Sequence, residues 1–188
     1  MSIWREVYLI SVDWFGLSRA TAIIGLSSDS ATNANSVFNS QRLAESDPRT
    51  TVDAAAFAAI LDGLGRYGES EAIYRRALAV FEESFGPVHY EVAATLHNLA
   101  AVLVTKRNYQ EAEENYRRAL SIKERLLGAD STDVALTCSN LGSLLTVLGR
   151  RSESVPLLKS AIAILETRLT PAHPQLVLAR ENLRKALS

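Results

Sequence analysis

Apolar positions along most of the chain follow the period of an α-helix. In residues 92–103 they fall at Val92, Leu96, Leu99 and Leu103, which are spaced by four, three and four residues. Residues 109–127 show the same period, and the polar stretch 106–108 separates the two segments. Asn108 followed by Glu111 has the capping-box pattern that begins a helix. Alternating amphipathic segments with short breaks predict antiparallel helix pairs and an all-α fold.

The helical pattern recurs at a fixed offset of 42 residues. Three blocks align at this offset: 74–80 with 116–122 and 158–164, the turns 85–87, 127–129 and 169–171, and the pairs 98–99, 140–141 and 182–183. Because one offset accounts for separate blocks, each unit is predicted to be the same pair of helices.

Small residues occupy equivalent positions in these units. The first helices have Ala58, Ala100 and Gly142, and the second helices have Ala77, Ala119 and Ala161. Helices approach to about 8–10 Å only where the side chains between them are small. A single pair cannot bury its apolar faces alone, so stacked neighbours are expected to complete the core.

Three motifs give the chain its resemblance to a known family. They are Leu-His-Asn-Leu-Ala at 96–100, the segment from Tyr109 to Ile122, and Leu-Gly-Ala-Asp at 127–130. The pattern resembles the tetratricopeptide repeat in the 42-residue form of kinesin light chains. The resemblance implies a right-handed α-α superhelix of about three helix pairs with a C-terminal capping helix. We expect repeats near 47–87, 88–129 and 130–171, a closing helix at 174–187, and a separate N-terminal segment at 1–46.

The N-terminal segment differs from the repeats. Its apolar residues Ile3, Val7, Ile10, Trp14 and Leu17 predict an amphipathic helix, and residues 27–40 are rich in Ser and Asn, as linkers are. Three interpretations stay open at this point: a cap on the first repeat, a segment that docks in a groove of its own or another copy, or a disordered start.

Composition and charge exclude several classes of function. The 188 residues include 20 Lys and Arg against 21 Asp and Glu, a net charge of −1, which argues against binding to nucleic acid or anionic lipid. The single Cys138 excludes an intrachain disulfide and a cysteine-based zinc site. Glu6 and Asp13 interrupt the most apolar terminal stretch, so neither a membrane span nor a signal peptide is expected. A cytoplasmic protein is predicted.

Apparent catalytic motifs do not fit their context. Residues 63–68 match G-x-G-x-x-G, but they join two predicted helices instead of a strand and a helix. His89 and His173 are expected at the same turn position of different repeats, and Cys138 at a packed position. We therefore expect no enzyme activity, no cofactor and no metal site.

The resemblance implies a partner-binding groove along the concave face, formed by the first helices. It points to the asparagine of Leu-x-Asn-Leu-Ala, because an amide can pair with the backbone of an extended peptide; the first unit has Ala56 there. The predicted groove residues are His97, Asn98, Ala101, Thr105, Ser139, Asn140, Ser143, Asn182 and Lys185. A groove lined by these residues would be largely neutral. The alternative is that the asparagines only tie neighbouring helices together.

The predicted second helices carry repeated arginines at 75–76 and 117–118. These are interpreted as a solvated outer face that pairs with Glu residues one turn away. The predicted function is a noncatalytic protein–protein interaction module that binds a peptide or helix of a protein partner. The alternative is a structural protein that forms homo-oligomers through its N-terminal segment or the open ends of the array.

Overall fold

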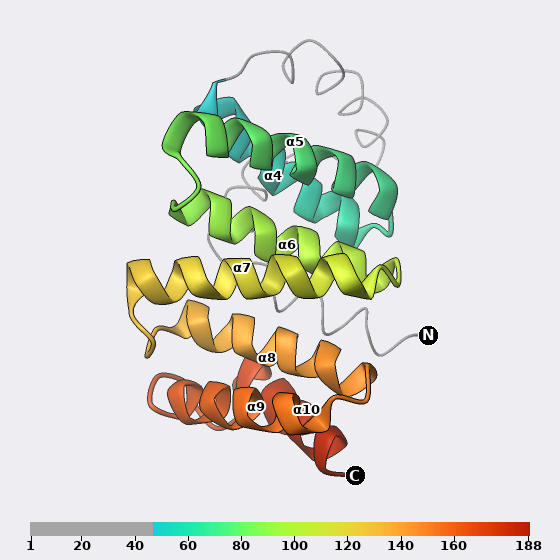
Figure 1. The fold of residues 1–188 in the computed structure, drawn as a ribbon, viewed down its shortest axis with the longest axis vertical. Helices are drawn as coiled ribbons and strands as arrows, with labels where there is room; N and C mark the ends of the chain where they lie inside the picture. Colours follow the sequence, from blue (N-terminus) through green and yellow to red (C-terminus); the bar gives the residue numbers. More distant parts are fainter. Residues whose placement is uncertain (1–46) are drawn as a thin grey trace.

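The computed structural model describes residues 47–188 (Figure 1). Within this range the secondary structure is helical throughout, without a strand. The helices are α4 (Pro48–Gly63), α5 (Tyr67–Phe85), α6 (Tyr90–Thr105), α7 (Tyr109–Leu127), α8 (Thr132–Val147), α9 (Arg151–Glu166) and α10 (Pro174–Leu187). The amphipathic helix and linker predicted within residues 1–46 lie outside the described residues.

The helices stack in chain order, so that each contacts the next along the array (Figure 1). Contacts of α6 with α4 and with α8 are more extensive than those of α7 with α5 and with α9. The layer of first helices is therefore more closely spaced than the layer of second helices, and it forms the inner side of the curve. The fold is the predicted right-handed α-α superhelix of three helix pairs with a C-terminal helix.

Small residues bring the two helices of each pair together. Ala58 and Gly142 face α5 and α9, and the hydroxyls of Ser70 and Ser154 donate to their backbone carbonyls at 2.8 and 2.6 Å. A Cβ added to Gly142 would lie 2.7 Å from Leu158 Cγ. The close approach predicted from the small residues is therefore confirmed at Ala58 and Gly142.

The turn inside each pair has one backbone form. Gly65, Arg107 and Gly149 follow one another at the 42-residue offset, and all three have positive φ, at 80°, 63° and 75°. After each of them an amide reaches back to a carbonyl of the last helical turn, as in Asn108 N to Leu103 O at 2.9 Å. This is the Schellman type of helix end, in which glycine is usual because it adopts positive φ without strain.

The first helices begin at side-chain caps, whereas the second helices do not. Asp47, Ser131 and the two turn histidines accept backbone N–H groups at the starts of α4, α8, α6 and α10. The capping box predicted at Asn108 is wrong. Its amide instead donates to the Glu111 carboxylate at 2.8 Å, because the tight turn already engages its backbone N–H.

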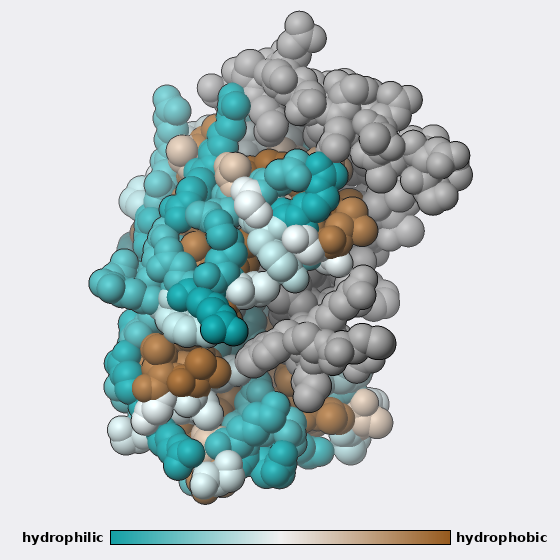
Figure 2. Space-filling model, turned by 90° about the vertical axis from the view of Figure 1, so that its right-hand side faces the viewer, coloured by the Kyte–Doolittle hydropathy of each residue, from teal (hydrophilic) through white to brown (hydrophobic). Residues whose placement is uncertain are grey.

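The edge formed by the turns within the pairs is mainly hydrophilic. Figure 2 views the molecule from this side and shows separate apolar patches with polar surface between them. Leu64 and Leu148, at equivalent turn positions, are 61% and 37% exposed, whereas the second pair has Lys106 there. The apolar surface is thus interrupted at the middle repeat.

Candidate functional site

The predicted groove residues lie on the first helices α6, α8 and α10, which form the inner layer. Their exposure differs. His97, Ala101, Ser139 and Asn182 are buried, Asn98, Asn140 and Ser143 are half-buried, and Thr105 and Lys185 are exposed. The half-buried polar side chains of the inner layer therefore lie between buried residues and the exposed ends of the helices.

Two of the predicted asparagines are hydrogen-bonded to tyrosines of the preceding second helix. Asn98 of α6 is bonded to Tyr74 of α5, and Asn140 of α8 is bonded to Tyr116 of α7. Burial raises the pKa of both tyrosines well above the usual value, so their hydroxyls stay neutral. Each asparagine therefore ties its helix to the previous pair while its amide remains half-buried.

His97 joins α6 to α8 through both ring nitrogens. Asn140 Nδ2 can only donate, so it donates to His97 Nε2 at 3.2 Å, and this requires the proton to sit on Nδ1. Nδ1–H then donates to Thr137 Oγ1 at 3.1 Å, and Thr137 donates to the Asp133 carbonyl at 2.8 Å. The imidazole also packs edge-on against the Tyr116 ring.

This arrangement keeps His97 neutral. Burial, assisted by the positive charge of nearby Lys123, lowers the pKa of His97 well below 6.5. Lys123 is itself buried and lies 3.5 Å from Asp133. His97 thus acts as a neutral link between first helices, a role that the sequence did not indicate.

Asp62, near the end of α4, is a polar residue that the sequence analysis missed. It is only 2% exposed, and neither carboxylate oxygen has a hydrogen-bond partner within residues 47–188. Burial raises the pKa of Asp62 to about 7. The first helices, whose lining was expected to be largely neutral, therefore contain a titratable carboxyl at α4. The 42-residue offset could have revealed it, because Val104 and Thr146 occupy the equivalent positions.

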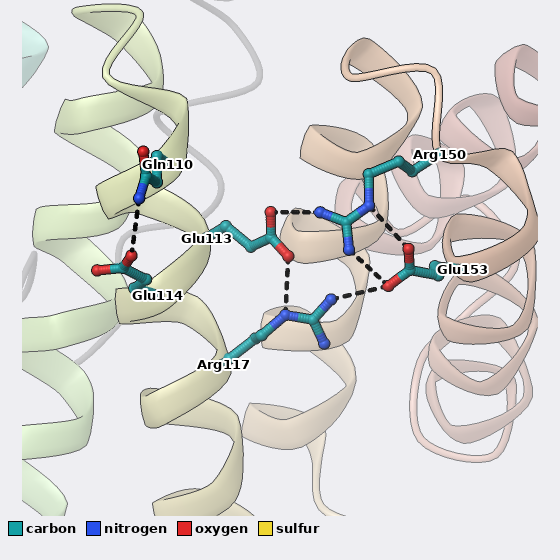
Figure 3. Close-up of polar contacts among 6 residues, drawn as sticks. All are labelled: Gln110, Glu113, Glu114, Arg117, Arg150 and Glu153. Atoms are coloured by element: carbon teal, nitrogen blue, oxygen red, sulfur yellow. Dashed lines mark hydrogen bonds and ion pairs between the residues drawn. The ribbon is translucent and has the colours of Figure 1, made fainter.

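The arginines of the second helices form ion-pair networks on the outer layer. In Figure 3, Arg117 of α7 pairs with Glu113 one turn earlier, at 2.9 Å, and with Glu153 of α9, at 3.0 Å. Arg150 pairs with both of these carboxylates, at 2.7 Å each. The predicted pairing one turn away is present for Arg117, and the network also connects successive repeats. Arg118 instead pairs with Glu82 of α5.

The preceding repeat has a corresponding network. Arg75 of α5 pairs with Glu71 one turn earlier and with Glu111 of α7, and Lys106 pairs with Glu71 as well. Exposed pairs of this kind contribute little stability individually, typically about 0–1 kcal/mol. Their effect here is to neutralise Arg75 and Arg117 with carboxylates.

The residues excluded as catalytic have structural roles. His89 and His173 cap α6 and α10, because Nδ1 of each accepts a backbone N–H at 3.3 Å. Cys138 is buried, and burial raises the pKa of its thiol to about 11, so the reactive thiolate is disfavoured. In residues 47–188 no group of three or more His, Cys, Asp or Glu side chains could hold a metal ion. The same range contains no helix that is long and apolar enough to cross a membrane.

Comparison with known proteins identifies the family. The tetratricopeptide repeat family matches residues 51–124 and 91–167, which together are more than half of the chain. The chain therefore belongs to the tetratricopeptide repeat family, as the helix pairs and their 42-residue offset indicate. No curated protein matches the chain.

Solved structures of kinesin-light-chain-like repeats are similar to this protein. BtubC (BKLC) from P. vanneervenii is 26% identical with a TM-score of 0.62, over 75% of this chain and 61% of BtubC. This chain thus spans less than two thirds of BtubC. A Podosopora anserina kinesin-light-chain protein with nearly identical TPR-like repeats is 16% identical with a TM-score of 0.62, over 97% of this chain and 83% of that one. At that identity the second similarity shows the fold alone.

Proposed function

We propose that the protein is a noncatalytic interaction module that binds a peptide or helix of a protein partner along the inner layer of first helices. The family is generally one of protein-interaction modules. A cytoplasmic location fits this proposal, because a single buried cysteine is typical of a reducing compartment.

One observation carries the proposal: the half-buried amides of Asn98 and Asn140 recur at the same position of successive first helices. Each amide has four hydrogen-bonding positions, and the bonds to Tyr74, Tyr116 and His97 use only some of them. The remaining capacity suits the repeating N–H and C=O groups of an extended backbone, whatever its side chains are.

The test must separate partner contact from the helix-tying role of the same asparagines. We would select peptides from a random library displayed on phage, using the purified full chain, and measure their affinity for two double variants. Asn98→Ala with Asn140→Ala removes both roles. Tyr74→Phe with Tyr116→Phe removes only the bonds from the asparagines to the tyrosines and leaves the bond from Asn140 to His97.

If the amides contact the peptide, the asparagine variant loses affinity by at least about tenfold, and the tyrosine variant loses much less. Circular dichroism melting checks that both variants are folded. Equal losses in the two variants would assign the asparagines to structure alone. Failure of the library to yield any specific binder would contradict the proposed function itself.

A further inference from the structure

The unpartnered carboxylate of Asp62 belongs to α4, a first helix of the inner layer. Its charge adds to burial in raising the pKa of Tyr74 and Tyr116, which lie on the second helices α5 and α7. These tyrosines are the partners of Asn98 and Asn140.

Two basic residues at the adjacent turns already pair with other carboxylates. Arg66 pairs with Glu69 in a two-bonded contact with distances of 2.6 Å, and Lys106 pairs with Glu71. A buried carboxylate without a cation is costly, because neither water nor a hydrogen bond compensates its charge. Asp62 is therefore buried and has no partner within the described chain, as expected of a carboxylate whose cation is missing.

We propose that Asp62 receives an arginine side chain of the peptide bound along the inner layer. Both of its oxygens lack partners, so the carboxylate can accept the two parallel N–H groups of a guanidinium. A guanidinium is more weakly hydrated than an ammonium and is therefore better suited to a site screened from water. This assignment rests on the proposed function, since it names one side chain of the peptide that the inner layer would bind.

The amphipathic helix predicted within the N-terminal segment does not have the chemistry of this occupant. On the amphipathic helix predicted from Ile3 to Leu17, Arg5 and Arg19 would lie opposite the apolar stripe, because each residue turns the helix by about 100°. Docking of that stripe on the inner layer would point both arginines away from Asp62. The charges beside the stripe are the acidic Glu6 and Asp13.

The experiment selects peptides from a random phage-displayed library on three versions of the full chain. These are the wild type, Asp62→Asn, and Asp53→Asn as a control on the exposed side of the same helix. We expect the wild type and the control to enrich peptides with arginine at a fixed position, and Asp62→Asn to lose this preference. Specific binders without a fixed basic residue, shared by all three proteins, would overturn the arginine assignment and leave the proposed function standing. No specific binder on any version would overturn both.

A second measurement needs no variant of the protein. A selected peptide is synthesised with arginine, lysine or citrulline at the fixed position, and the affinity of each for the wild type is measured by calorimetry. Citrulline keeps the shape of arginine without its charge, and we expect it to weaken binding by at least about tenfold. Lysine should bind between the two, because it keeps the charge but not the paired N–H groups. Equal binding by arginine and citrulline would overturn the ion pair, and equal binding by arginine and lysine would overturn the guanidinium assignment.

Discussion

Replacing Asp62 by Asn should stabilise the free protein at neutral and alkaline pH. Burial raises the pKa of this carboxyl from 3.8 to about 7, so the folded protein holds a proton that the unfolded chain releases between these values. The folded state is then favoured by protonation. The contribution of Asp62 to stability is fully present below about pH 4 and is lost as the pH rises through 7.

The size of the effect follows from the shift of the pKa. Each pKa unit corresponds to about 1.4 kcal/mol, so a shift of about three units sets an upper limit near 4 kcal/mol for the ionised form. Local relaxation and water penetration reduce the cost of burying a charge, and we expect about 2–4 kcal/mol. Asn has nearly the same shape as Asp without the charge, and it therefore removes this cost while keeping the packing.

Urea unfolding of the full chain measures the difference between Asp62→Asn and the wild type near pH 4 and near pH 8. We expect almost no difference at the acidic end and a more stable variant at the alkaline end. Other titrating groups are common to both proteins and cancel in this difference. Asp53→Asn, at an exposed position of the same helix, should show neither effect. A difference that does not change with pH would refute the reasoning, as would a less stable variant near pH 8.

Three further predictions concern single positions. Arg107→Gly should raise the free energy of unfolding by about 0.5–1 kcal/mol, because Arg107 has φ 63° where Gly65 stands in the preceding unit; an unchanged urea midpoint would contradict this. Gly142→Ala should lower that free energy by about 1–2 kcal/mol, because the new Cβ would lie 2.7 Å from the branch point of Leu158; thermal melting measures the change, and a stabilised variant would show that Leu158 moves freely. The pKa of His97 is well below 6.5 in the folded protein, so its contribution to stability is present above pH 6.5 and is lost as the pH falls, by up to about 1.4 kcal/mol per pH unit. His97→Gln should remove this dependence of the free energy of unfolding on pH. An identical dependence in the variant would assign it to another group.

The 42-residue offset predicted the architecture because it identifies the residues that occupy equivalent positions in successive repeats. Ala58, Ala100 and Gly142 indicated close helix contact without any knowledge of distances, since only small side chains permit it. The resemblance placed Asn98 and Asn140 on the inner layer. Helix periodicity also gave the elements themselves, apart from the side-chain cap expected at Asn108.

The hydrogen bonds of the inner layer could not be predicted in the same way. They connect helices of different repeats, as between Asn98 and Tyr74 or between His97 and Thr137, and periodicity within one helix does not specify which polar groups meet. The ion pairs between successive second helices have the same origin. Arg117 was expected to pair within its own helix, and its second partner, Glu153, lies on the next second helix.

The burial of a residue that departs from the repeat decides what that departure costs in stability. Arg107 departs from Gly65 and Gly149 at an exposed turn, where the cost is limited to the backbone of one residue. Asp62 departs from Val104 and Thr146 at a buried position, where the cost is that of an uncompensated charge. Binding of a cation removes the cost of the buried charge at Asp62, whereas it leaves the backbone cost at Arg107 unchanged. A buried departure of this kind therefore couples stability to ligand binding, and Asp62→Asn should stabilise the free protein while weakening its binding of an arginine-containing peptide.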